Sequence, residues 1–352
     1  MTVVSNEAAR PVCDSLIGWI GGKDRLRATI INCMPPHFCY VEIFCGSASI
    51  FFGKDPKQCR VEIINDVHED LVNLMKVISG TYFDDAVRDE FIGYVRGMPA
   101  ARAVFEDWKH WGPDELEKLS PAQRAFRFYY CVKKGFSSSI QGGYEASPFA
   151  VSRYNQNTDF EPFTERFRAN NAQIERLDFR ELIRKYNRTV GDRKKPAQET
   201  LTFFVGDPPY FIDSLTHYYH HGFSRQDHED LRKCCNEITK NGNKFLLTYD
   251  DVPETIELYS GFYIYRTDPI IYKSAHEDVK RELSKTELII TNYDIAQLIR
   301  ERNTSGFSDA SLRKGRPFGT PFEDEEQPSA EDDGRIEIPG HLGLQTLETM
   351  PF

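Results

Sequence analysis

Short apolar segments alternate with amphipathic stretches toward both ends of the chain. Seven of these segments are strand candidates, because each is brief, apolar and closely followed by glycine, aspartate or asparagine. They are Tyr40–Phe44, Val61–Ile64, Ile174–Leu177, Leu201–Val205, Lys244–Thr248, Phe262–Arg266 and Glu287–Thr291. Strands separated by helical segments predict an α/β fold, with a mostly parallel sheet covered by helices on both faces.

The middle and the end of the chain follow other patterns. Residues 80–170 carry Phe, Trp and Leu at irregular helical spacing and no series of strands, which predicts an inserted, mostly helical domain. The α/β domain then consists of residues 15–79 and 171–302. Residues 303–352 are rich in Pro, Gly, Ser and acids, and we predict an acidic, disordered tail there.

Length and composition bound the classes of protein that remain. A chain of 352 residues is long enough for about two domains. It contains no apolar run of the roughly 20 residues that a membrane span needs, and its start lacks a signal-peptide pattern, so we expect a cytoplasmic protein. The eight cysteines include no C-x-x-C pair, which predicts reduced thiols and neither a zinc site nor a disulfide scaffold.

Charge is distributed unevenly along the chain. The net charge is −10, but the tail from Asn303 holds ten acidic and four basic residues and accounts for −6 of it. The stretch from Ser120 to Lys195 contains fifteen basic and eight acidic residues, with aromatic residues among them. This net charge of +7 is typical of a surface that meets phosphates, although an ordinary solvated helical face has the same composition.

Three short segments near the start suggest a nucleotide-like ligand. The glycines of G-W-I-G-G-K, residues 18–23, allow a ligand to approach Trp19 and Lys23, although such a pair is also common in plain turns. The segment Y-V-E-I-F-C-G-S-A-S, residues 40–49, predicts a strand, a glycine loop and a helix, but it lacks the G-x-G-x-x-G pattern of dinucleotide sites. Asp66 follows Gly46 by 20 residues, a position suited either to ribose hydroxyls or to a helix N-cap.

The segment F-F-V-G-D-P-P-Y, residues 203–210, is the sharpest motif. Its two prolines fix the backbone and remove two N–H donors, so they end the strand abruptly. The carboxylate of Asp207 and the carbonyl of Pro208 can together accept both hydrogens of an exocyclic amine, and the ring of Tyr210 can stack on the base that carries it. The motif therefore predicts a pocket for an amino-bearing base.

Taken together, these blocks resemble the DNA adenine-N6 methyltransferases of the Dam type, the D12 class. The resemblance covers about residues 15–295 and also includes I-N-D with V-H-E-D-L, I-E-R-L-D-F at 174–179 and T-E-L-I-I-T-N-Y at 286–293. It implies a Rossmann-like methyltransferase sheet with an inserted target-recognition domain at residues 80–170. It also implies an enzyme that transfers a methyl group from S-adenosylmethionine to N6 of a flipped adenine in double-stranded DNA, without a metal.

The resemblance assigns roles to residues of this chain. The implied cofactor contacts are Trp19, Lys23, Glu42, Gly46, Asp66, Asp178 and Asp207. The implied catalytic residues are Asp207, Pro208, Pro209 and Tyr210. Base flipping costs a few kcal/mol, after which Tyr210 is expected to stack on the adenine while Asp207 and the Pro208 carbonyl accept hydrogen bonds from its amino group.

The inserted domain overlaps the basic stretch, which strengthens the expectation that it binds DNA. The residues expected to contact phosphates are Arg124, Arg127, Lys133, Lys134 and Arg153, and the loop Ser137–Gln141 is expected to enter the major groove. The sequence K-K-G-F-S-S-S-I-Q-G-G-Y departs from the loop that is usual in Dam-type enzymes, so the GATC target is not carried over.

Three alternatives and a biological setting accompany this interpretation. The alternatives are the same fold acting on RNA adenine, the same fold acting on N4 of DNA cytosine, and a catalytically silent DNA-binding module. The histidines at 217, 220, 221 and 228 are interpreted as loop and helix residues and not as metal ligands. We expect a bacterial, phage or mobile-element setting, with a cognate restriction endonuclease as a candidate partner.

Overall fold

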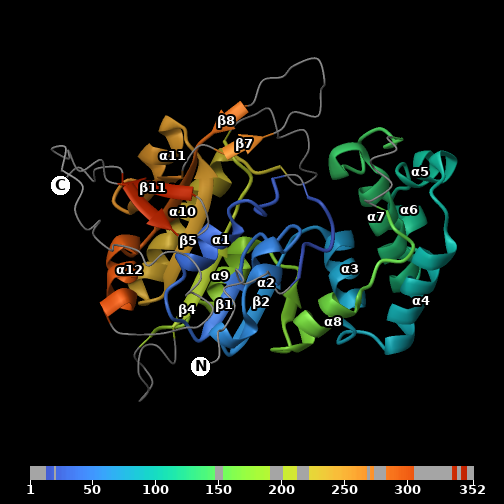
Figure 1. Ribbon diagram of the computed structural model, residues 1–352, viewed down its shortest axis with the longest axis horizontal. Helices are drawn as coiled ribbons and strands as arrows, with labels where there is room; N and C mark the ends of the chain where they lie inside the picture. The colour runs from blue at the N-terminus through green and yellow to red at the C-terminus, as the bar shows by residue number, and fades with distance from the viewer. Residues whose placement is uncertain are drawn as a thin grey trace, which may run out of the picture.

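The sheet at the centre of the protein contains all seven strands that the apolar segments predict. The computed structural model describes residues 13–19, 21–146, 154–190, 201–211, 222–267, 270–272, 283–304, 335–338 and 342–346. Within these residues the sheet has nine strands in the order β10-β11-β6-β9-β5-β4-β1-β2-β3 (Figure 1). Its strands are β1 (Cys39–Glu42), β2 (Val61–Asn65), β3 (Gln173–Glu175), β4 (Thr202–Gly206), β5 (Lys244–Asp250), β6 (Tyr263–Thr267), β9 (Glu287–Thr291), β10 (Arg335–Ile338) and β11 (Leu342–Thr346).

Strand direction identifies the architecture. The pairs β2–β3, β1–β2, β1–β4 and β4–β5 are parallel, whereas β9 runs antiparallel between β5 and β6. Helices connect the parallel strands, as the right-handed crossover of such strands requires. The prediction of an α/β, Rossmann-like sheet is confirmed. A separate pair, β7 (Ile270–Tyr272) and β8 (Leu283–Lys285), forms a small antiparallel hairpin that the apolar pattern did not predict.

Both faces of the sheet are buried, each against its own set of helices. Tyr40 belongs to one apolar cluster and its neighbour Val41 to the other, because successive side chains of a strand point to opposite faces. The helices are α1 (Arg27–Asn32), α2 (Ser49–Gly53), α3 (Glu69–Ser79), α4 (Asp85–Gly97), α5 (Arg102–Trp108), α6 (Pro113–Leu116), α7 (Pro121–Lys134), α8 (Glu161–Arg168), α9 (Phe179–Tyr186), α10 (Arg225–Lys240), α11 (Pro253–Leu258) and α12 (Ile295–Thr304), with 3₁₀ turns at Pro56–Gln58 and Phe136–Ser138. Helices α1, α2, α3 and α7 contribute to the first cluster, and α9 and α10 to the second.

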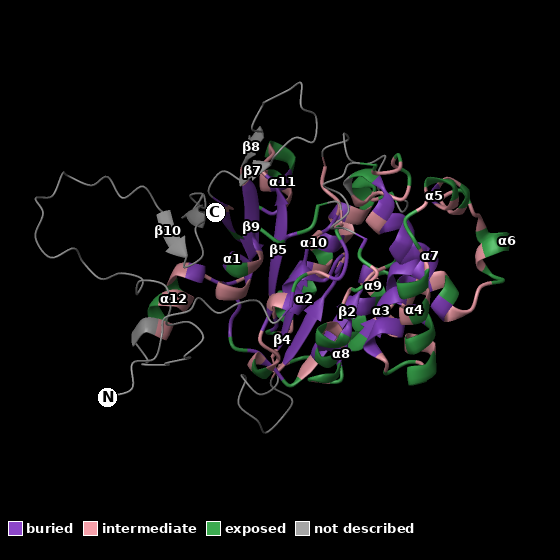
Figure 2. Ribbon diagram, turned by 45° about the vertical axis from the view of Figure 1, so that its right-hand side comes forward, coloured by how far each residue is buried: buried purple, intermediate pink, exposed green. Residues whose placement is uncertain are grey.

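Helices α4 to α7 lie together beside the sheet, with α3 and α8 between (Figures 1 and 2). Helix α7 is buried along most of its length, because α3, α4 and α5 pack around it. It begins at a capping box in which Ser120 accepts from the Gln123 N–H at 3.2 Å and the Gln123 side chain accepts from the Ser120 N–H at 3.0 Å. The aromatic residues of the basic stretch, such as Phe128 and Tyr130, are therefore core residues of this helical group.

The tail corrects one prediction. We predicted disorder for most of residues 303–352 and no strand there, yet Arg335–Ile338 and Leu342–Thr346 form an antiparallel hairpin, and Leu344 to Thr346 pair with β6. Strand β6 would otherwise lie at the edge of the sheet with unpaired N–H and C=O groups, and a short alternating segment satisfies them. Net acidity and a high Pro and Gly content masked this short strand signal.

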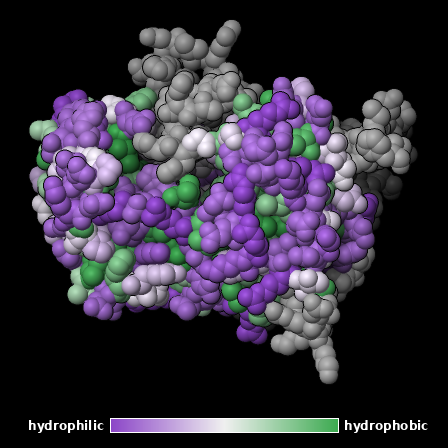
Figure 3. Space-filling view, turned by 180° about the vertical axis from the view of Figure 1, so that it is seen from behind, coloured by the Kyte–Doolittle hydropathy of each residue, from purple (hydrophilic) through white to green (hydrophobic). Residues whose placement is uncertain are grey.

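The outer surface is mostly hydrophilic. Figure 3 shows one face on which polar residues predominate and hydrophobic ones appear in small, scattered patches. Within the described residues, no helix has the length and apolar character to cross a bilayer.

A buried ion-pair network connects α8 to the sheet. The guanidinium of Arg166 donates to both carboxylate oxygens of Glu62 at 2.7 and 2.8 Å and to the Phe51 carbonyl at 2.8 and 3.1 Å. Lys54 donates to the same carboxylate at 2.9 Å, and all three charged side chains are fully buried. Bidentate pairing offsets the cost of burying these charges, so the network fixes where the chain returns from the helical group to β3.

Replacing Arg166 tests this network. Arg166→Ala leaves Glu62 with a single cationic partner in a buried site, and we expect it to lower the free energy of unfolding by about 3–5 kcal/mol. Urea denaturation measures the loss. Arg168→Ala is the matched control, because Arg168 pairs with Asp85 at the surface, with side chains 40% and 66% exposed, and we expect a loss below about 1 kcal/mol. Equal losses in the two variants would contradict a structural role for the network.

Candidate active site

The loop that joins β1 to α2 is held by the end of β2. Gly46 has φ +49° and its N–H donates to Asp66 Oδ2 at 3.0 Å, while the N–H of His68 donates to Asp66 Oδ1 at 2.9 Å. A Cβ at Gly46 would lie 2.8 Å from Trp19 Cδ1, so only glycine allows the indole to pack on this loop. The N-cap of α3 is His68, whose Nδ1 accepts from the Leu71 N–H, and the N-cap alternative for Asp66 is wrong.

Trp19 contacts residues of two separate segments, His68 after β2 and Phe128 of α7. Its indole lies edge-on to His68, with 5.7 Å between ring centroids, and 6.2 Å from Phe128 of α7. The adjacent Gly18 lies so close to the Ser138 side chain that a Cβ there would be 2.3 Å from Ser138 Oγ. The G-W-I-G-G-K segment is therefore packed between the glycine loop and the turn that follows α7.

Lys23 reaches the end of β4 from the same N-terminal segment. Its ammonium is 7% exposed, 2.9 Å from Asp207 Oδ1 and 3.5 Å from Glu287 Oε2, and it donates to the Gly21 carbonyl at 3.1 Å. It also lies 4.8 Å from the centre of the Tyr210 ring. Lys23 and Asp207, which are 184 positions apart in the chain, thus form a buried ion pair.

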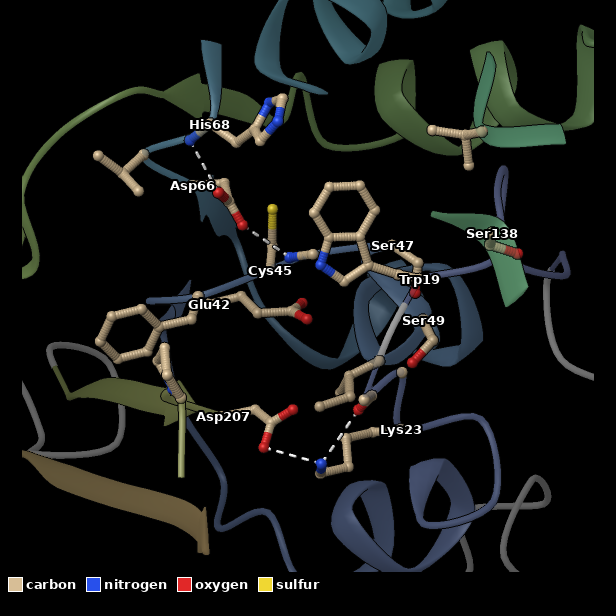
Figure 4. Close-up of a pocket in the computed structure, with 18 of the residues that line it drawn as sticks. Trp19, Lys23, Glu42, Cys45, Ser47, Ser49, Asp66, His68, Ser138 and Asp207 are labelled. Carbon is tan, nitrogen blue, oxygen red and sulfur yellow. Dashed lines mark hydrogen bonds and ion pairs between the residues drawn. The ribbon is translucent and has the colours of Figure 1, made fainter. Parts of the chain in front are cut away.

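Asp207 stands where strand pairing stops. The register between β4 and β5 ends at Gly206, as expected from the two prolines that follow Asp207. Besides Lys23, the hydroxyls of Thr248 and Tyr210 donate to Asp207 Oδ1, at 2.7 and 3.1 Å. Three donors therefore converge on one oxygen of this carboxylate, and Figure 4 shows the other oxygen turned toward the interior of a cavity that Glu42 also faces.

The cavity runs from Asp207 to Asp66 along the ends of β1, β2 and β4. Eighteen of its lining residues are drawn in Figure 4. It is lined by the predicted cofactor residues Trp19, Lys23, Glu42, Gly46, Asp66 and Asp207, together with Gly21, Gly22, Phe44, Cys45, Ser47, Ser49, Ile50, Val67, His68, Val132, Ser138, Ser139, Ile140 and Pro209. Six predicted residues that are scattered over the sequence thus meet in one space.

Burial shifts the pKa of Glu42 and of Asp207, two of the carboxyls that line this cavity. It raises the pKa of Glu42 to about 8, although the Tyr40 hydroxyl and the Phe51 N–H donate to Oε2 at 2.8 and 3.1 Å and oppose the shift. Burial also raises the pKa of Asp207, and the ammonium of Lys23 opposes this. The pKa of the Tyr210 hydroxyl lies well above its ordinary value for the same reason.

Asp178 follows Leu177, whose backbone exchanges hydrogen bonds with the Asn65 side chain at 2.8 and 3.0 Å. Asp178 is the N-cap of α9, where it accepts from the Arg180 N–H at 2.8 Å, and its side chain is 53% exposed and paired with the Arg180 guanidinium at 3.0 Å. It is not among the residues that line the cavity.

The structure corrects two of the expected phosphate contacts. Arg127 is 4% exposed, donates to the Trp108 carbonyl at 2.6 and 3.0 Å and lies 3.3 Å from Asp70, so it stabilises the helical group from within. Lys134 is 5% exposed and lies 4.7 Å from the ring centre of Tyr144. Net charge identified a basic stretch but could not tell that some of its cations are turned inward.

The other three expected phosphate contacts differ in their placement. Arg124 is half-buried and pairs with Asp70 and with Glu69, at 2.5 and 2.9 Å. Lys133 is partly exposed, with its ammonium 5.4 Å from the Tyr129 ring centre. Arg153 lies outside the described residues.

The sequence did not predict several residues that belong to the site. Glu287 and Thr248 contact the residues at Asp207 from β9 and β5, and Val132 with Ser138–Ile140 line the cavity from α7 and its following turn. Glu287 belongs to the T-E-L-I-I-T-N-Y block, but its buried position beside Lys23 depends on how β9 pairs with β5. The turn after α7 was expected to face DNA, and no spacing rule predicts its approach to Trp19.

Comparison with known proteins identifies the family. Residues 19–271 match the family described as D12 class N6 adenine-specific DNA methyltransferase. The chain belongs to this family. It depends on S-adenosylmethionine and methylates N6 of adenine in DNA, in agreement with the prediction from its motifs.

Individual relatives agree with this assignment. The Type II methyltransferase M1.LlaDCHI of Lactococcus lactis subsp. cremoris is 25% identical over 289 residues, which is 78% of this chain and 94% of the relative. The DNA adenine methylases of Salmonella typhi and Escherichia coli K12 are 23% and 22% identical over 254 residues, covering 70% of this chain and 84% of each relative. The chain is thus similar both to a Type II methyltransferase and to DNA adenine methylases.

The raised pKa of Glu42 predicts how stability depends on pH. The unfolded chain releases the Glu42 proton near pH 4.5 and the folded protein releases it near pH 8. The contribution of protonated Glu42 to the free energy of unfolding is therefore complete below pH 4.5 and is lost as the pH rises to about 8. At about 1.4 kcal/mol per pKa unit, the effect is on the order of a few kcal/mol. Glu42→Gln should therefore lose less unfolding free energy than the parent protein between about pH 5 and about pH 8 in urea titrations. Parallel pH profiles for the two proteins would contradict the assignment.

Proposed function

We propose that methyl transfer takes place where β4 ends, with Asp207 as the residue that accepts the N6 amino group of a flipped adenine. The observation that carries this proposal is the one-sided anchoring of its carboxylate. Lys23, Tyr210 and Thr248 all bond to Oδ1, and such fixed donors orient Oδ2 toward the cavity before any substrate arrives. A hydrogen bond from the amino group to Oδ2 would hold the nitrogen lone pair in line for transfer.

The neighbours of Asp207 complete the adenine end of the proposed site. The carbonyl of Pro208 would accept the second amino hydrogen, and Pro209, which lines the cavity, would fix the backbone that presents it. Tyr210 would stack on the base. Its hydroxyl is fixed by Asp207 and Glu287 at 3.1 and 2.9 Å, which restricts the rotation of the ring.

The other end of the cavity suits S-adenosylmethionine. When bound, this cofactor supplies a methyl group activated by a sulfonium. Gly46 lets the Trp19 indole lie against the loop after β1, and we place Trp19 and Gly46 along the cofactor, Asp66 at its ribose hydroxyls and Glu42 and Lys23 at its charged amino-acid part. The carboxylate of Asp66 accepts the backbone N–H groups of Gly46 and His68, which fix its orientation at the cavity. We place Asp178 near the adenine ring of the cofactor, because Leu177 before it hydrogen-bonds to Asn65, the residue before Asp66.

We infer that the helical group made of α4 to α7 recognises the DNA target. The turn after α7 reaches the cavity, so this group adjoins the site of chemistry. Lys133 and Arg124 remain as candidate phosphate contacts, with Arg153 beyond the described residues. The boundaries of the recognition domain at residues 80–170 stay a prediction.

The biological setting is also a proposal. A bacterial or phage cytoplasm and a cognate restriction endonuclease are consistent with the Type II relative. A test is whether DNA methylated by this enzyme in Escherichia coli becomes resistant to an endonuclease encoded beside its gene.

The central test is Asp207→Ala. The variant lacks the acceptor for the amino group, and we expect no detectable N6-methyladenine after incubation with S-adenosylmethionine and unmethylated plasmid DNA, measured by mass spectrometry of nucleosides. Retention of DNA in a mobility-shift assay should change less than about threefold, since the carboxylate does not contribute phosphate contacts.

Asp251→Ala is the matched control for Asp207→Ala. Asp251 follows β5 and pairs with Arg266 at 2.7 Å, so the variant loses a carboxylate on the same sheet and should still methylate. Methylation by Asp207→Ala would refute the proposed mechanism. Methylcytosine in place of methyladenine in the parent reaction would move the substrate to cytosine.

Lys133 offers a test of the DNA interface. Lys133→Gln should weaken binding severalfold for any sequence and lower the slope of log affinity against log salt by about one. Titrations of labelled duplex at several salt concentrations measure both quantities. The exposed residue Lys118 is the control, because it precedes the start of α7 whereas Lys133 lies near the end of that helix, and Lys118→Gln removes the same charge. An unchanged slope in Lys133→Gln would remove this residue from the interface.

A further inference from the structure

Glu287 is a buried carboxylate at the adenine end of the site with no role assigned so far. It is the first residue of β9, where its backbone N–H donates to Thr267 Oγ1 at 3.0 Å. Its side chain is 6% exposed, and Oε2 accepts from the Tyr210 hydroxyl at 2.9 Å and lies 3.5 Å from Lys23 Nζ. Lys23 and Tyr210, which contact Glu287, are thus also partners of Asp207.

The ammonium of Lys23 is shared by two carboxylates. It lies between Asp207 Oδ1 and Glu287 Oε2, at 2.9 and 3.5 Å. A pair of Lys23 and Asp207 alone would carry no net charge, whereas the trio with Glu287 carries one net negative charge. In a buried site this difference acts on a bound substrate with little screening by water.

The hydroxyl of Tyr210 is shared in the same way. A phenol has a single proton to donate, and this hydroxyl is 3.1 Å from Asp207 Oδ1 and 2.9 Å from Glu287 Oε2. The proton can serve only one of the two carboxylates at a time. Glu287 therefore competes with Asp207 both for this proton and for the ammonium, and its charge contributes to the raised pKa of Asp207.

Methyl transfer places positive charge next to Asp207. The N6 lone pair forms a bond to the methyl carbon while the carbon–sulfur bond breaks with its electrons on sulfur. Positive charge passes to N6 until the nitrogen releases a proton through Asp207 to water. A negative charge that is already oriented at that point lowers the barrier without reorganisation.

We propose that Glu287 is a positioning residue for this reaction. It draws the Lys23 ammonium and the Tyr210 hydroxyl partly away from Asp207, so that the Asp207 carboxylate is a more basic acceptor for the substrate amino group. The inference rests on the proposed role of Asp207. It adds a residue that touches neither base nor cofactor and acts through two residues that line or border the cavity.

Glu287→Gln tests the inference, because it keeps the size of the side chain and its acceptor for Tyr210 but removes the charge. The rate of a single turnover, measured with excess enzyme and labelled S-adenosylmethionine on unmethylated plasmid DNA, should fall about tenfold to a hundredfold. Cofactor affinity by calorimetry, DNA affinity by mobility shift and the midpoint of thermal unfolding should stay close to those of the parent protein. A purely structural role would instead lower binding and unfolding temperature together with the rate.

Two further variants sharpen the result. Glu287→Asp restores the charge on a shorter side chain and should recover part of the lost rate. Asp251→Asn is the matched control, because Asp251 contacts Arg266 and Thr286 beside Glu287 and should keep the parent rate.

The outcomes separate this inference from the proposed function. A parent rate in Glu287→Gln, together with an inactive Asp207→Ala, would overturn the inference and leave the role of Asp207 intact. Activity in Asp207→Ala would overturn both. If Glu287→Gln does not fold, Tyr210→Phe cuts one of the two links from the other side, and a parent rate in that variant would also overturn the inference.

Discussion

The parallel pairing of β1 with both β2 and β4 is the constraint on which the site depends. Glu42 is in register with Ile64 and with Val205, so the three strands end at one level. The chain leaves this edge through a glycine loop after β1, through Asp66 after β2 and through Asp207 after β4. Residues that are far apart in sequence then line one cavity because each follows a strand that ends there.

The N-terminal segment converts this edge into an enclosed site. Trp19 covers Gly46, and Lys23 crosses to Asp207, so a single short segment contacts both ends of the cavity. The packing of Gly18 against Ser138 brings in the turn after α7. The two ends of the cavity and the turn after α7 are therefore neighbours through contacts of Gly18, Trp19 and Lys23.

Local sequence predicted the sheet and most of the cavity, because both depend on short-range patterns. Apolar segments identified the strands, and the prolines at 208 and 209 identified where β4 ends. The role of Glu287 depends on the antiparallel pairing of β9 with β5, a long-range contact that no spacing along the chain reveals. The burial of Arg127 was equally hidden, since its guanidinium meets the Trp108 carbonyl only after α5 has packed on α7. The tail strands were missed because short alternating segments carry little signal within an acidic, Pro-rich stretch.

The tail hairpin, β10 and β11, extends the sheet beyond β6. By pairing with β6, β11 turns an exposed sheet edge into an interior strand, and β10, in which charged and apolar residues alternate, becomes the new edge. Exposed edges are templates for association between copies, and charged residues on an edge strand discourage it. Although its composition is that of a solvated extension, this segment thus covers a sheet edge at which copies of the protein could associate. Its removal is expected to lower solubility before it lowers catalytic activity.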